Sequence, residues 1–532
     1  MSILKNLRPL IVVLALAAVM PAFAGTSYRN PIIPGFYPDP SICRVGGDYY
    51  LVNSSFEYFP GVPIWHSRDL VNWRQIGHVL ARPSQLDLAD APCSDGIYAP
   101  TLRYHDGVFY MITTLVKNRT YRNFYVTATD PAGPWSDPVW YDQNGIDPSL
   151  FFDDDGKVYF QSNRGMTFAM ERAIYQSEID IKTGKRLTDP RLIWRGTGGC
   201  YVESPHVYKR DGYYYVMVAE GGTAYGHMVT IARSKNVWGP YESCPHNPIL
   251  SNRHAYEELH GTGHGDLVQA ADGAWWMVHL AFRKTVGDIH TLGRETCLEP
   301  VEWRDGWPMV NGNGTSRAIT EATLPPEQPW PAPPVRDEFE GGTLGLDWIH
   351  LRNPLAKDYS LAARQGFLRL NGSALTLADL GSPAFAGRRQ RHFEFDATTS
   401  LEFEPVAENE EAGLTLLMTN QHHYDFCIGK RGGRRVLQVK CNLELIQYVV
   451  AEVPLDPGAV QLRITGTKPH YVFSGAQGSA PFKEIARLNT RYLGTEVTSG
   501  YNGVIIGMYA TGNGKAAAVP ADFAWFDYQP RP

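Results

Sequence analysis

Three acidic residues occupy the same point of a repeated sequence unit and could act together on one substrate. They lie in the segments Asp39-Pro40, Asp147-Pro148 and Glu203-Ser204-Pro205. Because proline cannot donate to a strand ladder, each carboxylate is expected at the start of a strand. Carboxylates gathered in one place repel one another, which raises the pKa of at least one and leaves another ionised. Cleavage of a glycosidic bond requires that combination of a protonated acid and an ionised carboxylate.

The repeated unit is a turn with glycine, followed by aromatic and β-branched residues. Asp-Gly before such a run is a strong hairpin signal, because glycine accepts the positive φ of a tight turn. The copies follow one another at roughly 50–60 residues, close to the spacing of propeller repeats. They occupy residues 47–51, 106–110, 155–159, 211–215 and 272–276. In three repeats a turn that ends in tryptophan follows a strand-like run, at residues 67–73, 129–135 and 234–238.

Five copies of one hairpin unit predict an all-β protein with a five-bladed β-propeller over residues 28–322. The innermost strand of each blade lines the central channel of a propeller, so equivalent positions of the five blades converge. The positions just upstream of the turns are Asp39, Tyr98–Ala99, Asp147, Glu203 and His264. The alternatives are a β-sandwich with unrelated hairpins and, for each acidic residue, an Asp-Pro pair that only opens a turn. The regular spacing and the shared phase favour the propeller and one shared site.

A proline-rich stretch at residues 323–335 separates the two halves of the chain, and such a composition gives a semi-rigid linker. From 336 to 532, short runs alternate apolar and polar residues, with glycine and asparagine between them. This pattern predicts a C-terminal β-sandwich domain. Because the domain has no carboxylates at matched positions, we expect it to pack on the propeller and border the pocket without performing chemistry.

The N-terminus has the layout of a signal peptide over residues 1–24. Lys5 and Arg8 supply positive charge, an apolar run spans residues 11–19, and Ala22-Phe23-Ala24 is a cleavage site. The apolar run is short for a membrane span, and a retained N-terminal anchor is the alternative. The mature chain is therefore expected to be exported, periplasmic or secreted, and free of the membrane. The net charge of -6 gives no basic patch for nucleic acid.

The 7 cysteines have no CxxC spacing, which argues against a zinc site. Their odd number leaves at least one thiol free unless chains are cross-linked. A chain of this length does not need disulfides, so most of the cysteines are expected to be buried as small apolar residues.

The three acidic segments and three others resemble glycoside hydrolase family 43, which contains β-xylosidases and α-L-arabinofuranosidases. The resemblance covers nearly the whole chain after the signal peptide, and the C-terminal half is similar to the β-sandwich of the xylosidase-type members. The matching motifs are NPIIPGFYPDPS at 30–41, NSSFEYFPG at 53–61, GIDPS at 145–149, VESPH at 202–206, EGGT at 220–223 and LGRET at 292–296.

The resemblance implies a role for each acidic residue. Asp39 corresponds to the general base that activates water, and Glu203 corresponds to the general acid. Asp147 corresponds to a third carboxylate, which tunes the pKa of the acid and orients the sugar. Arg294 corresponds to an arginine that approaches both the substrate and Asp147; the alternative is a surface arginine.

Three further residues are expected at the site from the same resemblance. Phe56 corresponds to a hydrophobic wall of the sugar pocket, although by itself it would be a core residue. Tyr98 stands where many relatives have tryptophan, and this difference leaves open which pentose fits best. His264 corresponds to a central histidine that in some members ligates calcium or borders a water-filled ion site; a structural histidine is the alternative. No cofactor is expected to be required, while calcium or another ion at the propeller centre stays open.

The expected function is an exo-acting, inverting glycoside hydrolase that releases terminal xylose from β-1,4-xylo-oligosaccharides. The nearest alternative is an α-L-arabinofuranosidase, or a bifunctional enzyme, acting on arabinoxylan side chains. Two others are a retaining propeller enzyme of the fructosidase type and a non-catalytic sugar-binding propeller. The expected partners are xylo-oligosaccharide or arabinoxylan fragments, and a homo-oligomer remains open.

Overall fold

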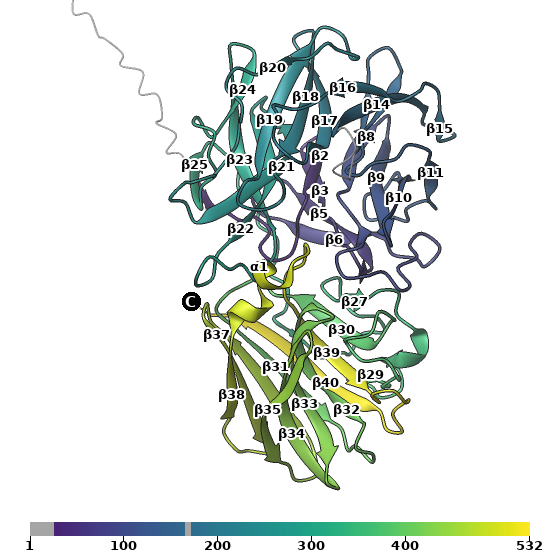
Figure 1. Cartoon of the computed structure of the whole chain (residues 1–532), viewed down its shortest axis with the longest axis vertical. Coiled ribbons are helices and arrows are strands. Elements are labelled where there is room, and N and C mark those ends of the chain that lie inside the picture. Colours follow the sequence, from purple (N-terminus) through teal and green to yellow (C-terminus); the bar gives the residue numbers. More distant parts are fainter. Residues whose placement is uncertain (1–25, 165–171, 532) are drawn as a thin grey trace, which may run out of the picture.

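The computed structural model describes residues 26–164 and 172–531, and these form two stacked bodies built almost wholly of antiparallel strands (Figure 1). The prediction of an all-β chain is confirmed. Helical turns in the described residues are limited to η1 (Ala356–Asp358), η2 (Thr490–Leu493) and α1 (Thr495–Thr498). None of the described helices is long and apolar enough to span a membrane. The predicted signal peptide, residues 1–24, lies outside the described part of the chain.

Five antiparallel sheets follow one another in the first body, one for each sequence repeat. The first consists of β2 (Ser41–Val45), β3 (Asp48–Val52), β5 (Gly61–Ser67) and β6 (Arg74–Leu80). The second consists of β7 (Gly96–Ile97), β8 (Thr101–His105), β9 (Val108–Lys117), β10 (Thr120–Ala128) and β11 (Val139–Tyr141). The third consists of β12 (Ser149–Phe152), β13 (Val158–Arg164), β14 (Ala173–Asp180), β15 (Lys185–Arg186) and β16 (Arg191–Trp194).

The last two sheets of this body repeat the same pattern. The fourth consists of β17 (Glu203–Arg210), β18 (Tyr213–Glu220), β19 (Met228–Ser234) and β20 (Glu242–Ser243). The fifth consists of β21 (Leu259–Gln269), β22 (Trp275–Arg283), β23 (Glu295–Arg304) and β24 (Trp307–Val310). All five predicted hairpins join the first strands β2, β8, β12, β17 and β21 to the strands that follow them. Asp106 and Asp211 adopt φ of 47° and 50° in two of these turns, each followed by a glycine with positive φ.

The five first strands contact one another in cyclic order. The contacts run β2–β8, β8–β12, β12–β17, β17–β21 and β21–β2. Each pair of neighbouring sheets shares a hydrophobic cluster, and one of these clusters joins the first sheet to the fifth. The ends are tied by β1 (Thr26–Arg29), which pairs with β25 (Ile319–Ala322). The starts of the first strands therefore lie around one axis.

Two larger sheets form the second body. One consists of β28 (Tyr359–Ser360), β29 (Leu368–Leu370), β40 (Ala521–Pro530), β31 (Phe395–Glu402), β36 (Val460–Gly466), β37 (His470–Gln477) and β38 (Lys483–Asn489), with β26 (Arg336–Asp337) beside β40. The other consists of β30 (Ala384–Arg389), β39 (Ile505–Thr511), β32 (Glu411–Thr419), β33 (His422–Arg431), β34 (Arg434–Leu443) and β35 (Ile446–Pro454). Both sheets contribute to one large buried cluster, so they share a single core.

The proline-rich stretch between the bodies contains no strand and lies against the first sheet. The Trp330 indole donates to the carbonyl of His66 over 3.2 Å, and the guanidinium of Arg74 lies 4.1 Å from the centre of the Trp330 ring. Cation–π contacts of this kind hold the segment in place.

The two bodies also contact each other directly. Strand β27 (His350–Leu351) pairs with β4 (Tyr58–Phe59) across the boundary, and residues of both bodies share a buried apolar cluster. The buried Arg352 donates to the carbonyl oxygens of Ala91 and Gly381, 2.7 Å from each. This interface lies beside the strand starts at which the candidate site is found.

Candidate active site

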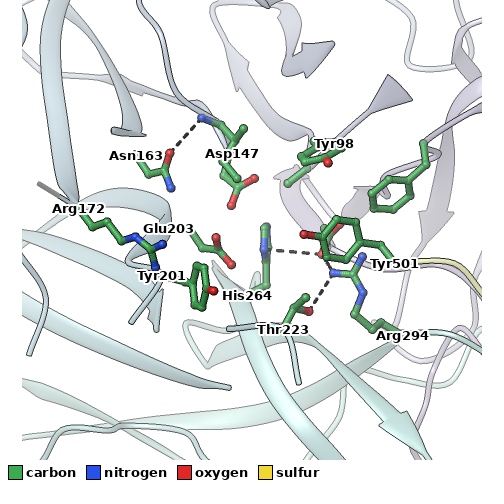
Figure 2. Close-up of a pocket in the computed structure, with 14 residues that line it drawn as sticks. Tyr98, Asp147, Asn163, Arg172, Tyr201, Glu203, Thr223, His264, Arg294 and Tyr501 are labelled. Atoms are coloured by element: carbon green, nitrogen blue, oxygen red, sulfur yellow. Dashed lines mark hydrogen bonds and ion pairs between the residues drawn. The ribbon is translucent and has the colours of Figure 1, made fainter. Parts of the chain in front are cut away.

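One small pocket lies at the starts of the five first strands, with a cavity volume of about 100 Å³ (Figure 2). The seven residues predicted from the sequence line this pocket together: Asp39, Asp147, Glu203, Arg294, Phe56, Tyr98 and His264. The expected convergence of the repeat positions is thus observed. Figure 2 shows Asp147, Glu203 and His264 pointing toward the same space from different strands.

An unusual backbone conformation recurs at three of these positions. Asp39, Asp147 and His264 adopt left-handed φ angles of 54°, 52° and 49°. In the fourth sheet the left-handed residue is Ser204, with φ of 55°, directly after Glu203. Non-glycine residues rarely adopt this region, and such backbone strain gathers at functional sites. The same local bend therefore presents side chains to the pocket in four of the five sheets.

Asp39 is buried and surrounded by groups that favour its ionised form. Its carboxylate accepts a 2.6 Å hydrogen bond from Nη1 of Arg294 and a short hydrogen bond from the Ser54 hydroxyl. Burial raises the pKa of Asp39, but the Arg294 charge and the Ser54 hydrogen bond outweigh it and hold that pKa below its usual value. An ionised carboxylate in this position can take a proton from water.

Asp147 and Glu203 form a coupled pair on adjacent first strands. Burial and the neighbouring Glu203 raise the pKa of Asp147 well above its usual value. Burial and the Asp39 charge raise the pKa of Glu203 to about 7. Near neutral pH the pair therefore retains a proton while Asp39 stays ionised. The site combines the acid and the base that glycoside hydrolysis requires.

Arg294 forms an ion pair with Asp39 and lies near Asp147 in the same pocket. Its Nη1 donates to the Asp39 carboxylate over 2.6 Å and to the hydroxyl of Thr223 over 3.1 Å. Its charge also partly offsets the rise in the pKa of Asp147, which is consistent with the approach to Asp147 that the resemblance implied. Among the described residues, Nε and Nη2 of Arg294 have no hydrogen-bond partner, which leaves two donor nitrogens for a bound sugar.

Three aromatic rings form one wall of the pocket. Phe56 stacks on Tyr501 at a centroid distance of 5.7 Å, and Tyr98 meets both rings at 5.4 and 5.9 Å. Tyr501 belongs to the C-terminal body, which therefore borders the pocket as the sequence predicted. Flat aromatic faces beside polar groups suit the apolar faces of a sugar ring.

His264 lies within β21, and its Nδ1 is 3.7 Å from the Asp39 carboxylate. Burial lowers the pKa of His264, so the imidazole is neutral at neutral pH. Calcium requires a shell of oxygen ligands. Here Asp39 accepts from Arg294, while Asp266 accepts from Arg103, so neither carboxylate is a free oxygen ligand for an ion beside His264. In residues 26–164 and 172–531, no group of three histidine, cysteine or acidic side chains is arranged to hold a metal.

The loop before Glu203 is held by the buried carboxylate of Glu220. This carboxylate accepts hydrogen bonds from the backbone N–H groups of Thr197 and Gly199, at 2.9 and 2.7 Å. It also accepts a 2.5 Å hydrogen bond from the Thr230 hydroxyl. Glu220 thus anchors the segment that carries Tyr201 and Glu203 into the pocket.

Sequence reasoning missed several pocket residues, namely Ile146, Asn163, Arg172, Tyr201, Thr223 and Tyr501. Thr223 lies in the EGGT motif and Tyr201 lies two positions before Glu203, so both had a local signal. Asn163 supports the third sheet, because its side chain accepts from the backbone N–H of Ile146 over 3.2 Å. Tyr501 had no local signal, since only the docking of the second body brings it to the pocket.

The 7 cysteines all lie in the described residues and form no disulfide. As expected, most are buried; Cys93 is partly exposed and Cys200 is exposed. Within the described residues, no disulfide therefore supports the pocket.

A small pocket with aromatic walls and three buried carboxylates of divergent pKa defines a glycoside hydrolase. The sequence matches the "Glycosyl hydrolases family 43" description over residues 28–308. Residues 336–529 match the "Beta xylosidase C-terminal Concanavalin A-like domain". The chain belongs to glycosyl hydrolase family 43 and is a glycosidase.

Relatives of this chain carry two kinds of activity in their names. It is 46% identical to the "Non-reducing end alpha-L-arabinofuranosidase BoGH43B" of Bacteroides ovatus, over 99% of each chain. It is 38% identical to a "Xylosidase/arabinosidase" of Butyrivibrio fibrisolvens, over 94% of this chain and 98% of the relative. Among solved structures, "Bacteroides ovatus Xyloglucan PUL GH43B" superposes with a TM-score of 0.91 at 45% identity, covering 95% of this chain and 100% of that one. The xylan β-1,4-xylosidase from Bacillus halodurans superposes with a TM-score of 0.90 at 36% identity, covering 94% and 99%.

Proposed function

We propose that this enzyme removes terminal pentoses from xylan-derived oligosaccharides by a single displacement with inversion, and that its main substrates are β-1,4-xylo-oligosaccharides. The observation that carries the proposal is the difference in protonation between Asp39, held ionised by Arg294, and Glu203, whose pKa is raised to about 7. In this mechanism Asp39 activates a water, and Glu203 protonates the departing oxygen. Asp147, whose own pKa is raised by the neighbouring Glu203, tunes the acid and orients the sugar, and the reaction uses no cofactor.

The order of the first strands supports inversion. Strands β2 and β17 do not follow one another in the ring, because β21 lies between them on one side and β8 and β12 lie between them on the other. Asp39, just before β2, and Glu203, at the start of β17, therefore approach the sugar from separate strands, whereas Asp147 lies just before β12, the neighbour of β17. An inverting enzyme needs its acid and base about 6.5–9.5 Å apart, so that a water fits beside the sugar.

The shape of the pocket supports exo action on a terminal sugar. The cavity is small, and Tyr501 from the second body covers part of its rim. A long chain that passed through on both sides would have to displace this aromatic wall. A chain end, by contrast, can enter with its terminal ring against Phe56 and Tyr98, and the free donors of Arg294 can meet its hydroxyl groups.

A second candidate activity is the release of terminal α-L-arabinofuranose from arabinoxylan side chains. It is favoured by the relative named as an arabinofuranosidase, at 46% identity over the full chain, and by relatives named for both activities. A bifunctional enzyme is consistent with both groups of names. Tyr98 carries an additional hydroxyl in the pocket. We expect the ratio of activity on xylosides to activity on arabinofuranosides to depend on this residue.

The architecture and the location of the protein complete the proposal. We interpret the five sheets around one axis as the blades of a five-bladed propeller over residues 28–322, joined by a linker to a β-sandwich over residues 336–532. The N-terminal pattern over residues 1–24 supports export to the periplasm or the medium. There the enzyme meets oligosaccharides that larger depolymerising enzymes release.

The test is a direct comparison of two aryl glycosides. Purified mature protein is assayed with aryl β-D-xyloside and aryl α-L-arabinofuranoside under identical conditions, and then with xylotetraose and an arabinoxylan oligosaccharide. We expect kcat/KM to be higher for the xyloside and the products from xylotetraose to shorten by one xylose at a time. A higher kcat/KM for the arabinofuranoside would assign the second activity. Activity on neither substrate, with a protein that is folded, would reject the proposal.

A further inference from the structure

A buried carboxylate behind the aromatic wall connects the two bodies of the enzyme. Glu57 follows Phe56 directly and is 2% exposed. One of its oxygens accepts a 2.7 Å hydrogen bond from Nδ2 of Asn502, which follows Tyr501 in the second body. The other accepts a 3.0 Å hydrogen bond from the backbone N–H of Ser94. Glu57 and its partner Asn502 thus each directly follow a residue that faces the sugar pocket.

Ser94 closes the same network from the other direction. Its hydroxyl oxygen accepts a 2.9 Å hydrogen bond from the backbone N–H of Tyr501. The preceding Gly500 has φ of +85°, and a Cβ there would lie 2.5 Å from the Ser94 hydroxyl. Only glycine fits this approach without strain. The backbone of Tyr501 is therefore fixed by Ser94, and Ser94 is fixed by Glu57.

Phe56 is held by equally tight contacts on its own side. Its φ is 48°, and its N–H and C=O exchange hydrogen bonds of 2.9 and 3.1 Å with Ile97. A Cβ at Gly96 would lie 2.1 Å from the Phe56 carbonyl oxygen, so this position also requires glycine. The Glu57 carbonyl accepts a 2.8 Å hydrogen bond from the backbone N–H of Arg352 in the second body. The backbones of Phe56 and Tyr501, whose rings stack on each other, are thus both held in place.

We propose that Glu57 is a positioning residue that sets the spacing of Phe56 and Tyr501, and through it the affinity of the pocket for the terminal sugar. The inference rests on the proposed function, because the wall is assumed to contact the substrate. Glu57 itself does not line the pocket, since its carboxylate is committed to Ser94 and Asn502. Its effect is therefore on binding and not on the acid or the base. Leaving a buried carboxylate without its hydrogen bonds costs free energy. The network therefore favours the one arrangement of the two bodies in which Glu57 keeps both partners.

The test exchanges donors and acceptors without changing shape. In Glu57→Gln, the new amide must point its N–H groups at either Asn502 or Ser94, so one donor meets another donor. KM for the favoured pentoside is expected to rise roughly tenfold, with a much smaller change in kcat, because a wall that contacts ground state and transition state equally contributes uniform binding. The pH dependence of kcat is expected to stay that of the wild type, since Asp39, Asp147 and Glu203 keep their neighbours.

The rescue variant reverses the polarity of one hydrogen bond. In the double variant Glu57→Gln with Asn502→Asp, the new amide at position 57 can donate to the new carboxylate at position 502, while the amide oxygen still accepts from Ser94. KM is expected to return toward the wild-type value, although each single variant raises it. The matched control is Glu496→Gln, which weakens another contact between the bodies, the 2.7 Å pair with His290, away from the pocket wall. This control is expected to leave KM unchanged.

The outcomes separate this inference from the proposed function. An active wild type whose Glu57→Gln variant keeps its KM overturns the positioning role and leaves the proposed function standing. A raised KM that the double variant does not restore, or that Glu496→Gln reproduces, shows general loosening of the interface and also overturns it. A folded wild type that neither hydrolyses nor binds any pentoside overturns the proposed function and this inference together.

Discussion

Nη1 of Arg294 donates to the Asp39 carboxylate over 2.6 Å and so joins the fifth sheet to the first at the base of the pocket. The contact gives one buried arginine two functions. It keeps the proposed base ionised, and its remaining donors stay available to the sugar. Since the same arginine holds Asp39 and presents unpartnered donors to the pocket, substrate binding and the pKa of the proposed base are expected to change together when it is altered.

Replacing Arg294 by alanine is expected to move the acidic limb of the kcat/KM profile to higher pH. Burial then acts on Asp39 without the opposing charge, and the loss of an opposite charge at this distance raises a carboxyl pKa by roughly one unit or more. Because the base must be ionised, activity at low pH falls first. Arg294→Lys, which keeps the charge, should show a smaller shift. An acidic limb that stays in place in both variants would separate Asp39 from the role of base.

Glu203→Gln removes the proposed proton donor and preserves the shape of the side chain. For substrates with a poor leaving group, kcat is expected to fall by roughly 10²–10⁴-fold, the usual contribution of a general acid. An activated phenolate leaves with little protonation, so the loss should be much smaller on such a substrate. Steady-state rates on xylobiose and on a dinitrophenyl xyloside provide the comparison. Equal losses on both would assign the acid elsewhere.

The same substitution has a predicted effect on stability. Burial and the Asp39 charge raise the pKa of Glu203 from its ordinary 4.5 to about 7. A carboxyl group whose pKa is raised by folding favours the folded state at low pH, and this contribution disappears as the pH rises through about 4.5 to 7. At pH 8 the ionised Glu203 therefore lowers the free energy of unfolding, by on the order of 1–3 kcal/mol.

Glu203→Gln cannot ionise, so its Tm is expected to exceed that of the wild type at pH 8 and to match it near pH 4.5. Thermal unfolding of both proteins at the two pH values tests this. The control is Glu496→Gln, which removes a carboxylate whose pKa is lowered. Its change in Tm should have the opposite dependence on pH. A Glu203→Gln variant less stable than the wild type at both pH values would contradict the prediction.

The repeat made the carboxylate positions predictable from sequence. Each hairpin turn marks where the first strand of its sheet begins. Asp39, Asp147 and Glu203 lie at equivalent distances before these turns, and this equivalence alone predicted that they meet in one place. The ion pair of Arg294 with Asp39 was not predicted, because the position of a strand in the repeat does not determine which carboxylate a long side chain contacts. The family resemblance named the arginine and its approach to Asp147, but not this ion pair.

Two other features of the site had no signal in the sequence. The left-handed backbone at Asp39 and His264 depends on how each first strand enters the ring, and aspartate and histidine adopt it without a local marker. Tyr501 reaches the pocket only because the second body docks through strand β27 and a shared apolar cluster. Docking of this kind arises from the complementarity of two folded surfaces, which no local pattern encodes.

A chain that ends at residue 335 is expected to lose both stability and activity. Removing the second body uncovers the apolar side chains of Phe36 and Tyr58 and deletes Tyr501 from the pocket wall. Exposed apolar patches of this kind favour aggregation. Tyr501→Ala in the full chain is the matched variant, because it removes the ring and leaves the interface in place; its KM should rise with little change in Tm. A truncated chain with full activity and the original Tm would show that the second body is dispensable.

The last prediction concerns the stereochemistry of the product. A retaining enzyme needs its two carboxyl groups about 5–5.5 Å apart because one attacks the anomeric carbon, while an inverting enzyme leaves room for water between base and sugar. Asp39 is held by Arg294 and by Ser54, which stabilises its charge and makes it a poor attacking group on carbon. It also lies just before β2, which does not neighbour β17, the strand that begins at Glu203. Hydrolysis of a β-xyloside is therefore expected to release α-xylose first, observed by proton NMR before mutarotation mixes the anomers. If β-xylose appears first, or a glycosyl adduct forms on Asp39, the residue acts as a nucleophile, and the retaining alternative of the fructosidase type applies.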